Sequence, residues 1–219
     1  MKYFKPFPLS VLVAVLLGSC AGPVSQEPKN LSTLKSEVKE YVTTKRYDAD
    51  LAIVAASANE WVAARARSGT ARPAVVFDID ETTLSNLDHM RQLDWGYQPE
   101  SWSKWVMTGK APAISPVREV YKTARANNVT VFFITGRRAS EKEATARNLR
   151  TQGMGDFEAL LVRSDDSKTA VGPFKAEERR NITEKGYTII ANIGDQQSDL
   201  DGGYSERTFK LPNPFYLIP

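Results

Sequence analysis

The sequence is poor in cysteine and histidine. Its 219 residues include one cysteine, Cys20, and one histidine, His89. A single cysteine cannot form a disulfide within the chain. A zinc site is usually built from several thiolate and imidazole ligands, and these two residues do not provide such a set. Any metal bound by this chain is therefore expected to have oxygen ligands.

The apolar run near the N-terminus is too short to cross a membrane. Residues 7–17 form a run of eleven apolar or small residues, whereas a spanning helix needs about 20. Lys2 and Lys5 precede the run, and the small residues of "LGSC" follow it. A positive start, a short apolar centre and small residues are typical of an export signal.

Cys20 closes this stretch, and Leu17-Gly18-Ser19-Cys20 resembles the lipobox of bacterial lipoproteins. We predict that residues 1–19 are a lipoprotein signal peptide, that Cys20 carries the lipid, and that residues 20–30 form a flexible tether. The alternative is an ordinary secretory signal with a cysteine near the cleavage site. The expected location is a membrane surface outside the cytoplasm, and Ala21 after the cysteine favours the outer membrane or the periplasmic face in a Gram-negative host.

The chain has no strong excess of charge of one sign. Its net charge is +3, and without residues 1–19 the count is 27 Lys and Arg against 26 Asp and Glu, or +1. A nearly neutral domain lacks the basic surface that binds nucleic-acid polymers. With 42% apolar residues, residues 31–219 are expected to form one globular domain.

The apolar residues alternate between helical and strand spacing. Helical patterns cover 31–43, 48–67, 115–127, 139–152 and about 175–185, and short apolar runs typical of buried parallel strands cover 74–77, 129–134, 159–162, 188–193 and, at an edge, 208–211. This order predicts an α/β fold, a doubly wound parallel sheet with N-terminal helices and a small aromatic-rich insert at about 84–113. The Ala-rich segment 48–67 is interpreted as packing against the domain, with a homodimer or lid surface as the alternative.

Polar side chains follow the predicted strands at their carboxyl ends, where open α/β sheets bind ligands. They are Asp78, Asp80 and Glu81 after the first strand, Thr135, Gly136 and Arg137 after the second, and Asp195 and Asp199 after the fourth, with Lys175 in the helix before it. The residues after the first strand do not match a calcium-binding loop of the EF-hand type, because Thr82, Thr83 and His89 stand at three positions where that loop needs other residues. If these residues are considered without the other strand ends, a turn that caps a helix is the alternative interpretation.

Four stretches carry a family resemblance: "VVFDIDETTLSN", "FFITGRRASEKEATARNL", "FKAEERRNITEKGY" and "NIGDQQSDLDG". Together they resemble the haloacid dehalogenase (HAD) superfamily, and most closely its bacterial lipoprotein acid phosphatases and the plant acid phosphatases and vegetative storage proteins. The resemblance covers about residues 45 to 215. Ser85-Asn86 is nearer to the plant type, since bacterial members more often have Asp-Asn there.

The resemblance implies a phosphate monoester hydrolase with Asp78 as the nucleophile that forms an aspartyl-phosphate. It implies that Mg²⁺ is held by an oxygen of Asp78, the backbone carbonyl of Asp80 and an oxygen of Asp195. The side chain of Asp80 would then protonate the leaving oxygen and later activate water, which predicts an acidic optimum. Thr135 and the Gly136 N–H would bind the phosphoryl oxygens.

The remaining polar residues have alternative interpretations. Lys175 is expected to neutralise the phosphate and to steady Asp78, with Lys168 as the alternative. Asp199 binds the metal through water, pairs with Lys175, or caps a helix at the surface. The arginines Arg137 and Arg138 contact phosphate or form a solvated pair, and Asp165 and Asp166 are interpreted as turn residues.

The insert contains three of the four tryptophans of the chain. Trp95, Tyr97 and Trp102 are predicted to line the substrate pocket, where their rings could stack on a nucleotide base or another aromatic leaving group. Core packing is the alternative, especially for Trp102 and Trp105, which lie three residues apart in a predicted helix. His89 is interpreted as structural or as a substrate contact.

The sequence is compatible with three functions. The first is a Mg²⁺-dependent acid phosphatase that acts on small organic monophosphates, among them nucleotides. The second is a storage or binding protein without turnover, which the intact Asp78 argues against. The third is a receiver-type signalling domain, which the predicted export disfavours.

Overall fold

The computed structural model describes Met1 and residues 27–218. Residues 2–19 of the predicted signal peptide, Cys20, which is predicted to carry the lipid, and most of the predicted tether lie outside the described residues. Among the residues that are described, no helix is both long enough and apolar enough to pass through a bilayer.

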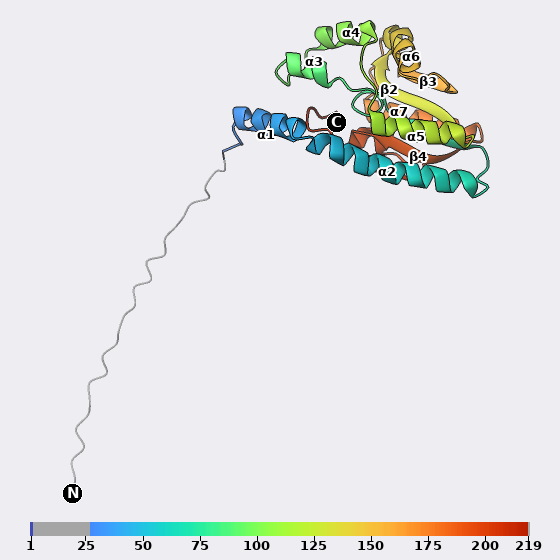
Figure 1. The fold of residues 1–219 in the computed structure, drawn as a ribbon, viewed down its shortest axis with the longest axis horizontal. Helices are drawn as coiled ribbons and strands as arrows, with labels where there is room; N and C mark the ends of the chain where they lie inside the picture. The colour runs from blue at the N-terminus through green and yellow to red at the C-terminus, as the bar shows by residue number, and fades with distance from the viewer. Residues whose placement is uncertain (2–26, 219) are drawn as a thin grey trace.

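One parallel sheet forms the centre of the molecule, with the strand order β3-β2-β1-β4-β5 (Figure 1). The strands are β1 (Pro73–Phe77), β2 (Thr130–Arg138), β3 (Ala159–Arg163), β4 (Thr188–Gly194) and β5 (Thr208–Lys210). All four neighbouring pairs are parallel. The predicted α/β fold with a parallel sheet is confirmed.

Helices connect the strands, close to where the periodicity places them. They are α1 (Leu31–Thr43), α2 (Arg46–Arg67), α3 (Leu87–Gln92), α4 (Pro99–Thr108), α5 (Ser115–Ala126), α6 (Lys142–Thr151) after a short 3₁₀ turn at Ala139–Glu141, α7 (Val171–Glu184) and α8 (Gln197–Leu200). Two boundaries differ from the sequence prediction in a way that affects the site. Strand β2 continues past Ile134 to Arg138, and α7 begins at Val171, four residues before Lys175.

The two faces of the sheet bury alternate residues of the same strands. Val75 and Phe77 of β1 join a core formed with α2 and α5, whereas Ala74 and Val76 join a second core with α7. Side chains alternate between the faces of a strand, so a strand covered on both faces is apolar throughout. This is why β1 reads as a continuous apolar run.

Helix α2 lies along the sheet beside α5 (Figure 1). It buries Leu51, Ala55, Ala58 and Val62, and Trp61 donates its Nε1–H to the carbonyl of Ile190 in β4 at 2.7 Å. The small alanine side chains on this face of α2 thus allow the helix to pack closely against the rest of the domain, as predicted. A homodimer stays a prediction.

Helices α3 and α4 form the segment between β1 and α5, at one end of the sheet (Figure 1). Their interior is aromatic: the His89 ring stacks on Trp105 with 5.5 Å between the ring centroids. Trp105 also donates its Nε1–H to Oδ1 of Asn86 at 2.8 Å. Trp105 and His89 are thus structural residues that hold this segment together, and burial lowers the pKa of His89.

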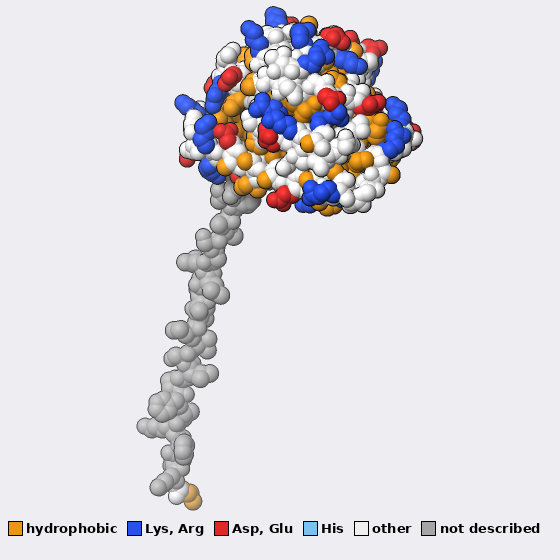
Figure 2. All heavy atoms as spheres, turned by 45° about the vertical axis from the view of Figure 1, so that its right-hand side comes forward, with side chains coloured by type: hydrophobic (Ala, Val, Ile, Leu, Met, Phe, Trp, Pro, Cys, Tyr) orange, Lys and Arg blue, Asp and Glu red, His pale blue; other side chains and the backbone are white. Residues whose placement is uncertain are grey.

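The exposed surface carries both signs of charge. On the face seen in Figure 2, Lys and Arg side chains are interspersed with Asp and Glu. Some are paired along one helix, as Lys122 is with Glu119 at 2.8 Å. Exposed pairs of this kind contribute little to stability.

Candidate active site

Asp78 is placed by the topology of the sheet. The chain proceeds from β1 to β2 and β3 on one side and returns to β4 and β5 on the other, so the connections diverge at the carboxyl ends of β1 and β4. Such a switch point is where open α/β sheets bind ligands. Asp78 follows β1 directly, donates its N–H to the carbonyl of Ile193 at 2.9 Å, and is buried.

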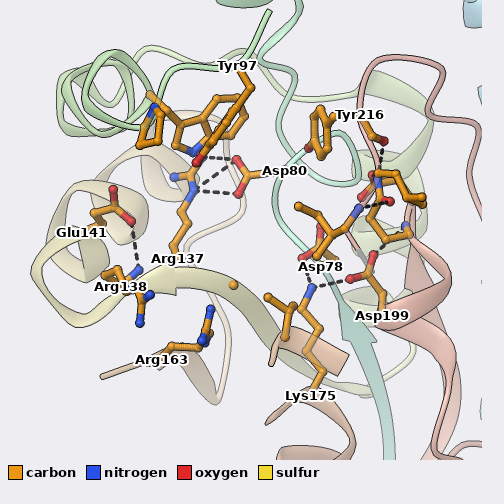
Figure 3. A pocket seen from close by; sticks show the side chains of 18 of the residues that line it. Asp78, Asp80, Tyr97, Arg137, Arg138, Glu141, Arg163, Lys175, Asp199 and Tyr216 are labelled. Carbon is orange, nitrogen blue, oxygen red and sulfur yellow. Dashed lines mark hydrogen bonds and ion pairs between the residues drawn. The ribbon is translucent and has the colours of Figure 1, made fainter. Parts of the chain in front are cut away.

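The two carboxylate oxygens of Asp78 have different surroundings. Lys175 donates from Nζ to Oδ1, whereas no hydrogen bond from a described residue reaches Oδ2. Asp78 also lines a cavity of about 530 Å³. One oxygen is therefore fixed by a cation, and the other is available to a ligand in the cavity (Figure 3).

Asp78, Asp195 and Asp199 bring three buried carboxylates together. One oxygen from each lies within 4.8 Å of the others. Gly194 permits this approach, because a Cβ at that position would lie 2.4 Å from the Cβ of Asp199. A set of oxygen donors without imidazole or thiolate suits a hard divalent cation. Three crowded acids are also costly to bury unless a cation neutralises them.

Burial and mutual repulsion change the pKa values of this cluster. Burial raises the pKa of Asp78 well above its usual range, against the lowering effect of Lys175, and Asp199 and Asp195 raise it further. Burial and Asp199 likewise raise the pKa of Asp195. Burial alone would lower the pKa of Lys175, but Asp78 and Asp199 outweigh it and hold the pKa above its usual range. The single positive charge of Lys175 thus does not balance the three carboxylates of the cluster.

Five donor groups, from neighbouring Gln196 and from three more distant residues, orient Asp195 and Asp199. Thr82 donates to Oδ1 of Asp195 at 2.9 Å, and the side-chain amides of Gln196 and Asn213 both donate to Oδ2 at 2.7 Å. Asp199 accepts from Lys175 at 2.6 Å and from the Gln196 N–H at 2.8 Å. Of the three interpretations of Asp199, the structure thus shows the pair with Lys175, together with a cap that is buried instead of exposed.

The Asp80 side chain points to a different partner. Arg137 donates from Nη2 to Oδ1 at 2.7 Å and from Nε to Oδ2 at 3.1 Å. Arg137 is 4% exposed, so its interpretation as half of a solvated pair is wrong. It is buried because β2 continues through this residue, and its Nη1 also donates to Thr145 at 2.9 Å. The proposed metal contact through the Asp80 carbonyl stays a prediction.

Thr135 and Gly136 lie inside β2 instead of after it. Thr135 is fully buried, and its Oγ1 accepts the Arg137 N–H at 3.2 Å. Gly136 lines the cavity, but Thr135 is not among the lining residues. Gly136 is thus placed where it can contact a phosphate in the cavity. The predicted contact between Thr135 and the phosphate stays a prediction.

Two of the three predicted pocket aromatics line the cavity. Tyr97 and Trp102 do so, with 5.6 Å between their ring centroids. Trp95 does not, and this prediction is wrong. Trp95 has a φ of 64° in the turn after α3, and its ring stacks on Phe215 at 5.6 Å, outside the cavity lining.

The alternative lysine and the paired acids lie outside the cluster. Lys168 is exposed and does not line the cavity, so the structure places Lys175, not Lys168, beside Asp78. Asp165 and Asp166 form a turn, and Asp165 accepts the backbone N–H and the hydroxyl of Ser140 at 3.1 and 2.7 Å. They are turn residues, as predicted.

The C-terminal segment contributes residues that the sequence analysis missed. Tyr216 lines the cavity and donates its hydroxyl to Oε2 of Glu81 at 2.6 Å. Glu81 is fully buried, and burial together with the Asp80 charge raises its pKa to about 8. It also accepts the Asn86 N–H at 2.6 Å. Glu81 therefore ties the loop after β1 to the C-terminal segment and is not part of the carboxylate cluster.

Comparisons with known proteins identify the family of this chain. A family model described as HAD superfamily, subfamily IIIB (Acid phosphatase), matches residues 21–219. Acid phosphatase 1 of Solanum lycopersicum is 35% identical over 204 residues, which cover 88% of this chain and 80% of that protein. Vegetative storage protein 1 of Arabidopsis thaliana is 28% identical over 199 residues, which cover 87% and 74%.

A solved structure shares the fold. The class C acid phosphatase from Bacillus anthracis superposes with a TM-score of 0.68 at 23% identity, over 84% of this chain and 86% of that one. The fold and the matching sequences define a phosphoric monoester hydrolase. The chain belongs to the HAD superfamily, subfamily IIIB, the acid phosphatases. The sequence-based identification is confirmed, and the buried carboxylates fit the divalent metal of this class.

Proposed function

We propose that this acid phosphatase hydrolyses small organic monophosphates, nucleotides among them, through an aspartyl-phosphate on Asp78 and with Mg²⁺ as its metal. The observation that carries the proposal is the asymmetry of Asp78. Its Oδ1 accepts from Lys175, and its Oδ2, with no hydrogen bond from a described residue, belongs to a side chain that lines the cavity.

Two steps use the residues in place. In the first, Oδ2 of Asp78 bonds to the phosphorus, the ester P–O bond breaks, and the leaving oxygen takes a proton from Asp80. In the second, water attacks the phosphorus, Asp80 accepts a proton from it, and the P–O bond to Asp78 breaks. Arg137 holds the Asp80 carboxyl at the cavity wall during both steps.

The metal is needed because a phosphate dianion approaches an acidic cluster. Asp78, Asp195 and the backbone carbonyl of Asp80 would hold it, with Asp199 beside them and paired with Lys175. The metal would supply positive charge that offsets the repulsion between Asp78 and the phosphate. Mg²⁺ suits a site made of carboxylate oxygens. The one histidine of the chain stacks on Trp105 and does not line the cavity.

Removal of the metal is expected to lower phosphate release at least about a hundredfold, because the acidic cluster then repels the substrate. The measurement is phosphate release from nucleoside, sugar and aryl monophosphates between pH 4 and 8, first with EDTA and then with Mg²⁺, Ca²⁺ or Zn²⁺ added in excess. Mg²⁺ should restore turnover. Full turnover in EDTA, or recovery with Zn²⁺ alone, would contradict the proposed metal.

The same assay separates the enzyme from a storage protein. Relatives of this chain include proteins named as vegetative storage proteins. If the folded, Mg²⁺-loaded protein releases phosphate from none of these monoesters, a storage or binding role replaces the proposal. The order of the substrates otherwise tells whether nucleotides are preferred.

We also propose that the enzyme is exported and anchored to a membrane by lipid on Cys20. The support is the sequence alone: one cysteine in the chain, directly after Leu17-Gly18-Ser19 and a short apolar run. In a bacterial host, labelled palmitate should enter the wild-type protein and be lost in Cys20→Ala. Equal labelling of the two proteins, or no labelling of either, would rule out the anchor.

A further inference from the structure

A second group of cationic side chains lines the cavity away from Asp78. It consists of Arg138 at the end of β2 and Arg163 at the end of β3. Figure 3 shows both on the side of the cavity opposite Asp199. Arg137 lies nearby, but Asp80 neutralises it at 2.7 Å.

No carboxylate among the described residues pairs with the guanidinium of Arg138 or Arg163. Glu141 also lines the cavity, yet its two oxygens accept the hydroxyl of Ser103 and the backbone N–H of Arg138, each at 2.9 Å. Both guanidinium groups instead meet neutral carbonyls. Arg138 donates to the carbonyls of Ser164 and Ser167 at 3.0 and 3.1 Å.

Arg163 is the less satisfied of the two. Its Nη2 donates to the carbonyls of Ser167 and Thr169, but its Nε is buried and has no hydrogen-bond partner in the part of the chain that is described. Burial lowers the pKa of Arg163, and the charge of Arg138 lowers it further. A buried donor without a partner beside a like charge is unfavourable. An anion in the cavity beside the two guanidinium groups would offset the repulsion between them.

We propose that Arg138 and Arg163 bind a second anionic group of the substrate. This group is a phosphate or carboxylate on the leaving group, the part of the substrate that is released when the phosphoryl group is transferred to Asp78. This inference rests on the proposed function and narrows its substrate class to monoesters that carry another anion. Guanidinium groups donate in the planar, bidentate manner that such oxyanions accept. The cavity of about 530 Å³ joins the two groups of residues, so one ligand can reach both.

The test compares flexible ligands that differ only in the second anion. Phosphate release is measured for alkanediol bisphosphates and for ω-carboxyalkyl phosphates with three to eight carbons, each against the n-alkyl monophosphate of equal length. The best dianionic ligand should have a kcat/KM about tenfold above its monophosphate, beyond the factor of two that two equivalent esters provide. The bisphosphate and carboxylate series then tell which anion is preferred.

Variants assign that preference to the arginines. Arg163→Met and Arg138→Met should each remove most of the tenfold ratio, whereas Arg150→Met, on the exposed side of α6, should retain it. Equal values for the two ligand series in the wild-type protein would overturn the inference. Equal losses on both series in the variants would also overturn it, since the arginines would then only support the loop at 164–169.

A binding measurement keeps this inference separate from turnover. Calorimetry of the Asp78→Asn protein with the same ligand pairs should show the same tenfold preference, which Arg163→Met added to Asp78→Asn should remove. If no ligand is hydrolysed by the wild-type protein but the preference in affinity is present, the proposed function fails and the second anion site stands. Equal affinities within each ligand pair would exclude the site.

Discussion

Replacement of Asp78 by asparagine is expected to lower phosphate release about 10⁴-fold or more. The amide has nearly the shape of the carboxylate, but it is neutral and a poor nucleophile, so no phosphoryl-enzyme forms. The variant keeps the position of residue 78, because the hydrogen bond from its N–H to the carbonyl of Ile193 belongs to the backbone. The measurement is single-turnover phosphate release with Mg²⁺ in excess.

A matched control distinguishes chemistry from charge. Asp88→Asn removes the same charge from the exposed side of α3 and should leave turnover unchanged. Wild-type protein quenched in acid during turnover should carry bound phosphate that hydroxylamine releases, and Asp78→Asn should carry none. Turnover by Asp78→Asn within tenfold of the wild type would mean that another group is the nucleophile.

The sequence predicts most of the scaffold because its strands are buried on both faces. Residues 74–77 form an unbroken apolar run and residues 188–193 a mostly apolar one, and the structure places them side by side as β1 and β4. Once the strands are parallel, their carboxyl ends share one edge of the sheet. That constraint, together with the direct pairing of β1 with β4, brings Asp78 near Asp195, although the two residues lie far apart in the sequence.

The remaining parts of the site depend on contacts that no local pattern encodes. Arg137 is polar and follows an apolar run, which is typical of a strand end, yet pairing of Arg138 with Arg163 extends β2 and buries Arg137 against Asp80. Tyr216 and Asn213 lie after the last strand in a segment without helical or strand periodicity. Their roles arise only from hydrogen bonds to Glu81 and Asp195 across the fold.

Lys175 is the residue whose loss should affect both stability and activity. It is 3% exposed and is the cation that pairs with Asp78 and Asp199 in the structure. Lys175→Met leaves these carboxylates buried without a positive partner. Breaking a buried ion pair from one side costs about 3–5 kcal/mol in the free energy of unfolding. Turnover should also fall about a hundredfold or more, because Lys175 would no longer neutralise the charge of the phosphate or hold Asp78 in position.

The pH dependence of the stability of Lys175→Met tells whether the loss of charge causes its destabilisation. Without Lys175, the pKa of Asp78, already raised by burial, rises further above its unfolded-state value. A carboxyl with a raised folded-state pKa stabilises the folded protein at low pH and loses that contribution as the pH rises. The destabilisation by Lys175→Met should therefore be larger at pH 8 than at pH 5, as measured by urea unfolding in EDTA.

Two comparisons complete this test. Saturating Mg²⁺ should reduce the destabilisation, because a bound cation replaces part of the missing charge and binds only the folded state. Lys168→Met, which removes an exposed lysine that does not line the cavity, should change neither stability nor turnover. A larger loss in Lys168→Met than in Lys175→Met would return the phosphate-binding role to Lys168. A pH-independent loss in Lys175→Met would mean that packing, not charge, explains why this lysine is buried.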